Sequence, residues 1–229
     1  RLVSMTSGPA RRHDFERLLT DSPSTPTGVA FGLAVLLGLG LLAGAWTAVV
    51  YLLSFWQYAV YTLAFLFRKV RLEVFIRDAL LLRTISLLAI AAVYLTLPVD
   101  WLSLAVVALG FFFNATATMA LGAARTYYGY ELAAIPAERV TAFPYSVMAH
   151  PMLIGNAIAF GGTLLNPAFR ADWWPLAVAH VVLNLAIVAM EVRARPVRPG
   201  RPPALPGAGL LAAWPAASAV ILLASVAAG

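Results

Sequence analysis

Long apolar runs alternate with short charged or proline-rich segments along this chain. The first run, 28–67, contains no charged residue. A straight helix of that length would extend about 60 Å, twice the roughly 30 Å hydrocarbon core of a bilayer. We therefore expect two membrane spans, near 29–47 and 49–67, joined by a tight turn near Trp46–Tyr51. The alternative is a single span followed by an interfacial helix.

Further apolar segments follow at intervals that suit a helical membrane protein. We expect full spans at four of them: about Ala79–Leu97, Leu102–Gly122, Trp173–Glu191 and Leu210–Ala228. Met152–Leu165 is also apolar but is shorter than the roughly 20 residues of a straight crossing, so it either crosses as a short helix or re-enters. The pattern predicts an all-α fold, a polytopic transmembrane helical bundle of about six to seven membrane helices.

Composition supports this fold class. Apolar and aromatic residues make up 62% of the chain and charged residues 11%, whereas soluble domains average about 45–50% and about 25%. An ordinary soluble globule is therefore excluded. The chain has no cysteine, which excludes disulfides and thiolate metal ligands. The three histidines are far apart in sequence and give no metal-ligand spacing, so we expect no metal site.

The positive charges indicate an orientation. If 28–67 forms two spans, all but two of the sixteen Lys and Arg residues lie on one side of the membrane. Those segments are 1–27, 68–78, 123–151 and 193–201. The positive-inside rule then assigns this side to the cytoplasm, and the surplus charge of +6 needs no nucleic-acid partner. The exceptions are Arg170 and Arg83, and we expect Arg83 to extend to the inner surface from near the end of its span.

Segment 123–151 is the first candidate for chemistry because it is long for a connection between helices and rich in aromatic residues and prolines. Pro151 restricts the residue before it and suits the first turn of a helix. His150 should therefore lie at a helix entrance, beside unpaired backbone N–H groups that can hold a carboxylate.

Polar residues within the apolar runs are further candidates. Glu191 ends an apolar helix, where it either binds a ligand or is solvated or paired with Arg193. His180 is either functional or hydrogen-bonded to a neighbouring helix. We also expect three polar side chains of one span to bond across helices, namely Asn114, Thr116 and Thr118.

Several short motifs resemble integral-membrane phospholipid N-methyltransferases. The most specific is the run Arg139-Val140-Thr141-Ala142-Phe143-Pro144-Tyr145, followed by His150-Pro151-Met152 and Gly155. Thr126-Tyr127-Tyr128-Gly129 resembles an upstream family element, and Glu191 matches one acid of a Glu-Glu pair. His-Pro in place of Asn-Pro is similar to the related isoprenylcysteine carboxyl methyltransferases. The resemblance covers about residues 122–193.

The resemblance implies an enzyme that transfers methyl groups from S-adenosyl-L-methionine to the amine of phosphatidylethanolamine or its methylated forms. The implied catalytic residues are His150, Glu191 and Tyr145, with His150 as the base. The implied cofactor-binding residues are Tyr127, Tyr128, Gly129, Pro144, His150, Pro151, Met152, Gly155 and Glu191. Four positions depart from the family pattern: Arg125, Ala149, Leu153 and Val192.

Two other functions are compatible with the sequence. One is methylation of another lipophilic acceptor, such as a prenyl-cysteine carboxylate or a thiol. The other is a non-catalytic membrane protein or small transporter. In either enzyme reading the partner is a membrane lipid, with no nucleic acid, and the sequence does not indicate an oligomeric state.

The expected organisation has four parts. Residues 1–27 form a cytoplasmic tail that lacks the apolar core of a signal peptide. Residues 28–122 form transmembrane helices 1–4. Residues 123–193 form the catalytic loop and a helical hairpin. Residues 194–229 form a Pro- and Arg-rich loop and an extra span. We expect an integral membrane protein, of a bacterial inner membrane, with its site on the cytoplasmic side.

Overall fold

The computed structural model describes residues 26–193, except 68–71, 131, 133 and 137. The N-terminal tail up to residue 25 and the expected span Leu210–Ala228 lie outside the described residues. The chain divides into two compact units, and the features below belong to the second, Val50–Ala204, unless stated otherwise.

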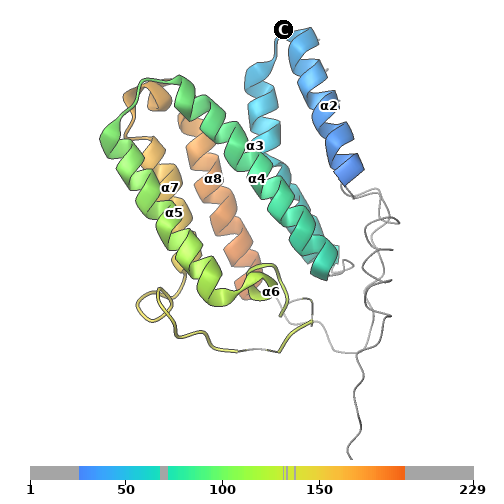
Figure 1. Cartoon of the computed structure of the whole chain (residues 1–229), viewed down its shortest axis with the longest axis vertical. Helices are drawn as coiled ribbons and strands as arrows, with labels where there is room; N and C mark the ends of the chain where they lie inside the picture. Colours follow the sequence, from blue (N-terminus) through green and yellow to red (C-terminus); the bar gives the residue numbers. More distant parts are fainter. Residues whose placement is uncertain (1–25, 68–71, 131, 133, 137, 194–229) are drawn as a thin grey trace, which may run out of the picture. The chain divides into compact units, whose positions relative to one another are not determined.

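The described part of the chain is helical and contains no strand, which confirms the expected fold class. Figure 1 shows the helices. Their bounds are α2 Pro26–Ala43, α3 Trp46–Phe67, α4 Leu72–Thr96, α5 Trp101–Leu121, α6 Ala123–Thr126, α7 Pro151–Thr163 and α8 Pro167–Arg193.

Among the described residues, three helices are long and apolar enough to cross a membrane: α4, α5 and α8. Helix α7 has 13 residues and is therefore about 20 Å long, less than the hydrocarbon thickness. The structure thus confirms a helical membrane bundle with one short helix, whereas the total of six to seven spans remains a prediction.

The apolar run 28–67 forms two helices, α2 and α3. They are separated at Gly44 and Ala45, slightly before the predicted turn, and Gly44 has a φ of +63°. Glycine adopts this left-handed conformation without the steric cost that a Cβ atom brings. The predicted break in the apolar run is therefore confirmed, two residues earlier than expected, whereas a membrane crossing by each of the two helices stays a prediction.

Helix α8 begins at Pro167, six residues before the predicted start. The Asn166 side-chain oxygen accepts hydrogen bonds from the backbone N–H groups of Ala168 and Phe169, at 3.0 and 3.4 Å. An asparagine N-cap followed by a proline at the first helical position is a common helix start. The apolar pattern missed it because Arg170 and Asp172 interrupt the first turns.

Glycines allow α5 and α7 to approach closely. A Cβ atom on Gly110 would lie 2.3 Å from the backbone nitrogen of Ala159, and one on Gly155 would lie 2.7 Å from the carbonyl oxygen of Gly110. Ser103 also donates a hydrogen bond of 2.7 Å to the carbonyl of Gly162. Small residues with such bonds are typical of helix packing in membranes, where burial alone gives little attraction between helices.

Candidate active site

A compact turn, called the hook below and made of residues 122–129, follows α5 and begins the loop that leads to α7. Gly122 ends α5 with a φ of +78°, and the short α6 follows. Tyr128 then stacks on Phe75 of α4, with ring centroids 5.2 Å apart and planes 7° from parallel. Arg125 and Glu138 form an ion pair that ties the loop back to α6.

His150 is the N-cap residue of α7, and Pro151 occupies the first turn, as the sequence predicted. The His150 side chain makes no capping hydrogen bond, and the residue is exposed. The side chain is thus not engaged in holding the helix end. The first backbone N–H groups of α7, including those of Met152 and Leu153, lie at the same end of the helix as His150.

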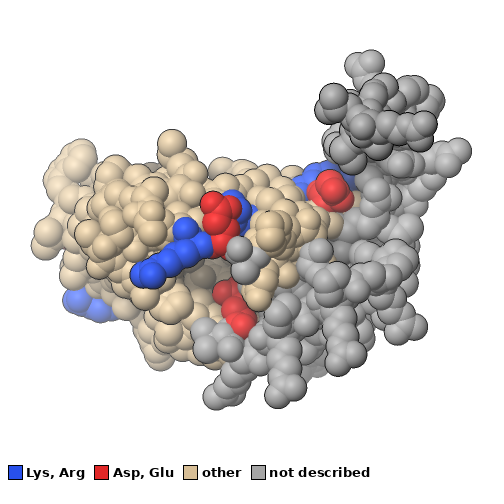
Figure 2. All heavy atoms as spheres, turned by 90° about the horizontal axis from the view of Figure 1, so that it is seen from below, with Lys and Arg blue, Asp and Glu red and all other residues tan. Residues whose placement is uncertain are grey.

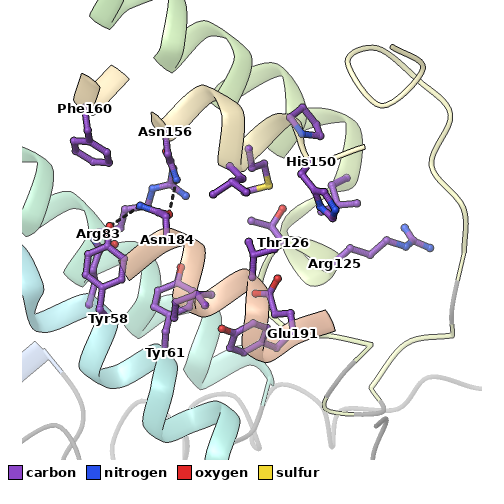
Figure 3. A pocket seen from close by; sticks show the side chains of 18 of the residues that line it. Tyr58, Tyr61, Arg83, Arg125, Thr126, His150, Asn156, Phe160, Asn184 and Glu191 are labelled. Atoms are coloured by element: carbon purple, nitrogen blue, oxygen red, sulfur yellow. Dashed lines mark hydrogen bonds between the residues drawn. The ribbon is translucent and has the colours of Figure 1, made fainter. Parts of the chain in front are cut away.

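A cavity lies between the loop, α7 and the inner faces of α3, α4 and α8 (Figure 3). Both polar and apolar side chains line it. Near the loop these are Arg125, Thr126, Tyr128, Tyr145, Ala149, His150, Pro151, Met152, Leu153 and Glu191. Further in are Gln57, Tyr58, Tyr61, Arg83, Leu87, Leu121, Asn156, Phe160, Asn184, Ile187 and Val188.

All three residues predicted to be catalytic line this cavity, although they come from separate segments. Tyr145 lies in the loop, His150 at the start of α7 and Glu191 near the end of α8. Partial burial, with a further contribution from the negative charge of Glu191, raises the pKa of Tyr145 above its usual 10.0. The structure therefore brings these three side chains to one place.

The residues predicted to bind a cofactor divide into two groups. Tyr128, His150, Pro151, Met152 and Glu191 line the cavity. Tyr127, Gly129, Pro144 and Gly155 are absent from its lining, and the structure gives a packing explanation for three of them. Tyr127 is buried beside the rings of Tyr61 and Phe75.

The rings of Tyr61 and Phe75 lie 6.2 and 6.4 Å from the ring of Tyr127, measured between centroids. A Cβ atom on Gly129 would lie 2.4 Å from the carbonyl oxygen of Ala124, so this glycine closes the hook after α6. Gly155 faces α5, as described above. These three residues pack around the cavity and do not line it, and their contact with a cofactor stays a prediction.

A chain of hydrogen bonds leads from the cavity through the bundle, and the sequence did not indicate it as a unit. Each member donates to the next, in the order Arg83, Asn114, Asn156, Asn184, Tyr58 and His180. The Asn114–Asn156 bond is 2.7 Å and the Asn156–Asn184 bond is 2.8 Å. The chain joins α4, α5, α7, α8 and α3, and the isolated amides in apolar spans were its sequence signal.

The first member of this hydrogen-bond chain decides which atom of each side chain donates and which accepts. An arginine can only donate, so Asn114 must present its side-chain oxygen to Arg83 and donate onward with its nitrogen. The same reasoning passes along Asn156 and Asn184 to Tyr58, whose hydroxyl hydrogen then points to Nδ1 of His180, 2.9 Å away. His180 is thus bonded to a neighbouring helix, which is the structural alternative given for it above.

Two sequence expectations about polar side chains are wrong. Thr116 and Thr118 do not bond across helices: their hydroxyls donate to carbonyls of their own helix, because a threonine in a helix reaches the preceding turn. Arg83 is not near the end of its helix, because α4 begins at Leu72, and it lines the cavity with a hydrogen bond to Asn114.

Figure 2 shows the molecule from the end where the loop lies. On this face the described acidic and basic side chains lie close together rather than in separate patches of one sign. Arg125 and Glu138 form an ion pair of this kind among the described residues. The cavity itself is lined by charged groups of both signs, namely Arg83, Arg125 and Glu191.

Part of the chain matches a protein-family model. Residues 99–194 match a family described as phospholipid methyltransferase. No curated protein and no solved structure matches the chain. The matched segment contains α5 to α8 and the loop with Tyr145 and His150, whereas α3 and α4 precede it. Residues 99–194 of this integral membrane protein are thus similar to the phospholipid methyltransferase family.

Proposed function

We propose that this protein transfers a methyl group from S-adenosyl-L-methionine to the amine of an ethanolamine phospholipid, either phosphatidylethanolamine or a methylated form of it. The observation that carries the proposal is the convergence on one cavity of three residues from the matched segment, Tyr145, His150 and Glu191. The reaction would take place on the cytoplasmic side, where the positive-inside rule assigns the loop.

The residues around the cavity suit the chemical groups of this donor. The carboxylate of Glu191 suits its ammonium group or its ribose hydroxyls. The start of α7 suits its carboxylate, since helix N-terminal N–H groups attract anions. The rings of Tyr128 and Tyr145 offer faces for an adenine or for the sulfonium charge. The match rests on complementary chemistry around a single hollow.

Methyl transfer needs alignment more than it needs a nucleophilic residue. Bound in the cavity, S-adenosyl-L-methionine supplies an electrophilic methyl group on a positively charged sulfur. The amine lone pair forms the new N–C bond as the C–S bond breaks, and the bonding electrons stay on sulfur as a neutral thioether. Holding two reactants in line can lower a barrier by about 7–11 kcal/mol. The walls of the cavity supply that alignment.

His150 is the proposed base. An ethanolamine amine carries a proton at neutral pH, and this proton must leave before nitrogen can attack. A histidine ordinarily titrates near neutral pH and can accept it. The side chain of His150 makes no capping bond and is exposed, so it can pass the proton on to water.

Other acceptors are the second candidate. The His150-Pro151 pair is similar to isoprenylcysteine carboxyl methyltransferases, which favours a prenyl-cysteine carboxylate or a thiol. Ala149, which stands where those enzymes carry an arginine, lines the cavity but cannot hold a carboxylate. The amine acceptor is therefore the better fit. The remaining alternative is a non-catalytic membrane protein or small transporter.

The test uses the full chain in lipid nanodiscs with methyl-labelled donor. Nanodiscs containing phosphatidylethanolamine should yield labelled mono- or dimethylated lipid, and nanodiscs of phosphatidylglycerol should not. Addition of a prenyl-cysteine peptide or a lipophilic thiol tests the second candidate in the same assay. Absence of labelled lipid, together with absence of donor binding by calorimetry, would overturn the proposal.

A further inference from the structure

Arg83 lines the cavity and is not used by the proposed reaction; the other such arginine, Arg125, is paired with Glu138. Arg83 lies well inside its helix. It is the twelfth of the 25 residues of α4, about 17 Å along the helix from its first residue. A charged side chain within a membrane span is costly and is usually retained for a function. We therefore expect Arg83 to interact with a ligand or a partner of opposite charge.

The described residues provide no such partner. Arg83 donates a hydrogen bond to the neutral side chain of Asn114, and no described carboxylate lies within salt-bridge distance of it. A guanidinium has five N–H donors, so most of them remain available. The carbonyl oxygens of Asn156 and Asn184 already accept bonds from their neighbours along the chain.

The hydrogen-bond chain also holds the arginine in position. Asn114 is 4% exposed and its nitrogen is bonded to Asn156 and to the carbonyl of Met152. Its oxygen is therefore fixed toward Arg83. A guanidinium held from one side presents its remaining donors to the cavity at little further cost in side-chain entropy.

The inner part of the cavity, which includes Arg83, is lined by apolar side chains as well as by polar ones. Leu87 follows it one turn along α4, and Phe160, Ile187 and Val188 line the same inner part of the cavity. A ligand that reaches this part thus meets a cation with several donors next to an apolar surface. An anionic oxygen cluster attached to a hydrocarbon chain combines the two properties.

We propose that Arg83 binds the phosphate of the phospholipid acceptor. This assignment rests on the proposed function, because it identifies the group that holds the lipid while its amine reaches His150. Planar guanidinium groups match phosphate oxygens with two parallel hydrogen bonds. The carboxylate of the donor has another place at the start of α7. Arg83 is thus a substrate-binding residue that recognises phosphate-bearing lipids.

The first test measures binding to the full chain in detergent by calorimetry. The probes are dihexanoyl phosphatidylethanolamine, inorganic phosphate and S-adenosyl-L-methionine. R83Q should weaken binding of the short-chain lipid by about tenfold or more, since hydrogen bonds to a charged group typically contribute that much. Donor affinity should be unchanged. The control is R170Q, because Arg170 is exposed and bonds a backbone carbonyl outside the cavity.

Each alternative result overturns the assignment. Equal lipid affinity in R83Q and the native protein would exclude a role for Arg83 in lipid binding. Loss of donor affinity in R83Q would assign Arg83 to the donor carboxylate instead. Inorganic phosphate binding as tightly as the lipid, with the same dependence on Arg83, would indicate a free-phosphate site.

A second measurement covers the case in which R83Q does not fold. In the native protein, the short-chain lipid should protect Arg83 from modification by phenylglyoxal, as followed by peptide mass spectrometry, and no protection would overturn the assignment. Failure of the proposed function looks different. In that case the native protein would bind the lipid through Arg83 but would neither bind the donor nor transfer a methyl group.

Discussion

At the residue scale, the two groups proposed for chemistry have different surroundings. His150 is exposed at the start of α7, whereas Glu191 is partly buried in the cavity wall. The first suits a residue that exchanges protons with water. The second suits a residue that contributes charge to a bound ligand. These differences lead to separable effects of substitution.

Replacing His150 by alanine should slow methyl transfer more than it weakens donor binding. General-base catalysis typically contributes about 10²- to 10⁴-fold in rate, so kcat should fall within that range while the donor Kd changes little. Both are measured on the same nanodisc preparation. The matched control is Val147→Ala, because Val147 is exposed in the same loop and does not line the cavity. Unchanged turnover in His150→Ala would exclude His150 as the base.

Replacing Glu191 by glutamine should weaken donor binding by about tenfold or more, because a charge-assisted hydrogen bond is lost. It should also lower the pKa of Tyr145. The Glu191 anion disfavours a second negative charge nearby, so its removal makes the tyrosinate easier to form. Ultraviolet pH titration, compared with Glu191→Gln/Tyr145→Phe, isolates this tyrosine. An unchanged titration would show that the two side chains do not interact.

At the scale of elements, the sequence predicted the helices well and their packing partners less well. Apolar runs and prolines indicate where a helix starts, as at Pro151, because these signals are local. Gly155 shows that local sequence signals do not predict which helix a residue packs against. Its motif implied cofactor contact, but its environment is set by Gly110 in α5, which lies far away in sequence. Arg83 was likewise misjudged because its partner Asn114 belongs to another helix.

The role of Gly155 can be tested against a control in the same helix. Gly155→Leu should destabilise the protein by about 1–3 kcal/mol, the usual cost of overpacking, because α5 leaves no room for a side chain. Gly161→Leu should be close to neutral, since a Cβ atom there has no neighbour within 4 Å. Thermal unfolding in detergent measures both. Loss of donor binding in Gly155→Ala without loss of stability would support the cofactor role instead.

At the scale of the whole described bundle, the hydrogen-bond chain from Arg83 to His180 links helices that apolar packing alone would hold loosely. Within a membrane, burial provides little attraction between helices, so interhelical hydrogen bonds gain importance. The chain connects the matched segment, which contains Asn114, Asn156, Asn184 and His180, to α3 and α4 outside it. It therefore joins the family segment to the rest of the cavity wall.

This linkage predicts coupling between Asn156 and Asn184. In a double-mutant cycle with alanine substitutions, the coupling energy should be about 0.6 kcal/mol and at most about 1.7 kcal/mol, as for other hydrogen bonds in membrane proteins. Reversible unfolding in detergent gives the required free energies. A control cycle pairs Asn156 with Thr116, whose hydroxyl bonds its own helix. Additive effects of Asn156→Ala and Asn184→Ala would contradict an energetically coupled hydrogen bond between Asn156 and Asn184.

The central claim is that the cavity beside Tyr145, His150 and Glu191 holds the methyl donor. The most direct measurement is an experimental structure of the protein in nanodiscs with S-adenosylhomocysteine, the product form of the donor. Density for a nucleoside is expected within the cavity, in contact with Glu191 and the start of α7. A saturated sample whose nucleoside density lies elsewhere on the protein, or nowhere on it, would contradict the account.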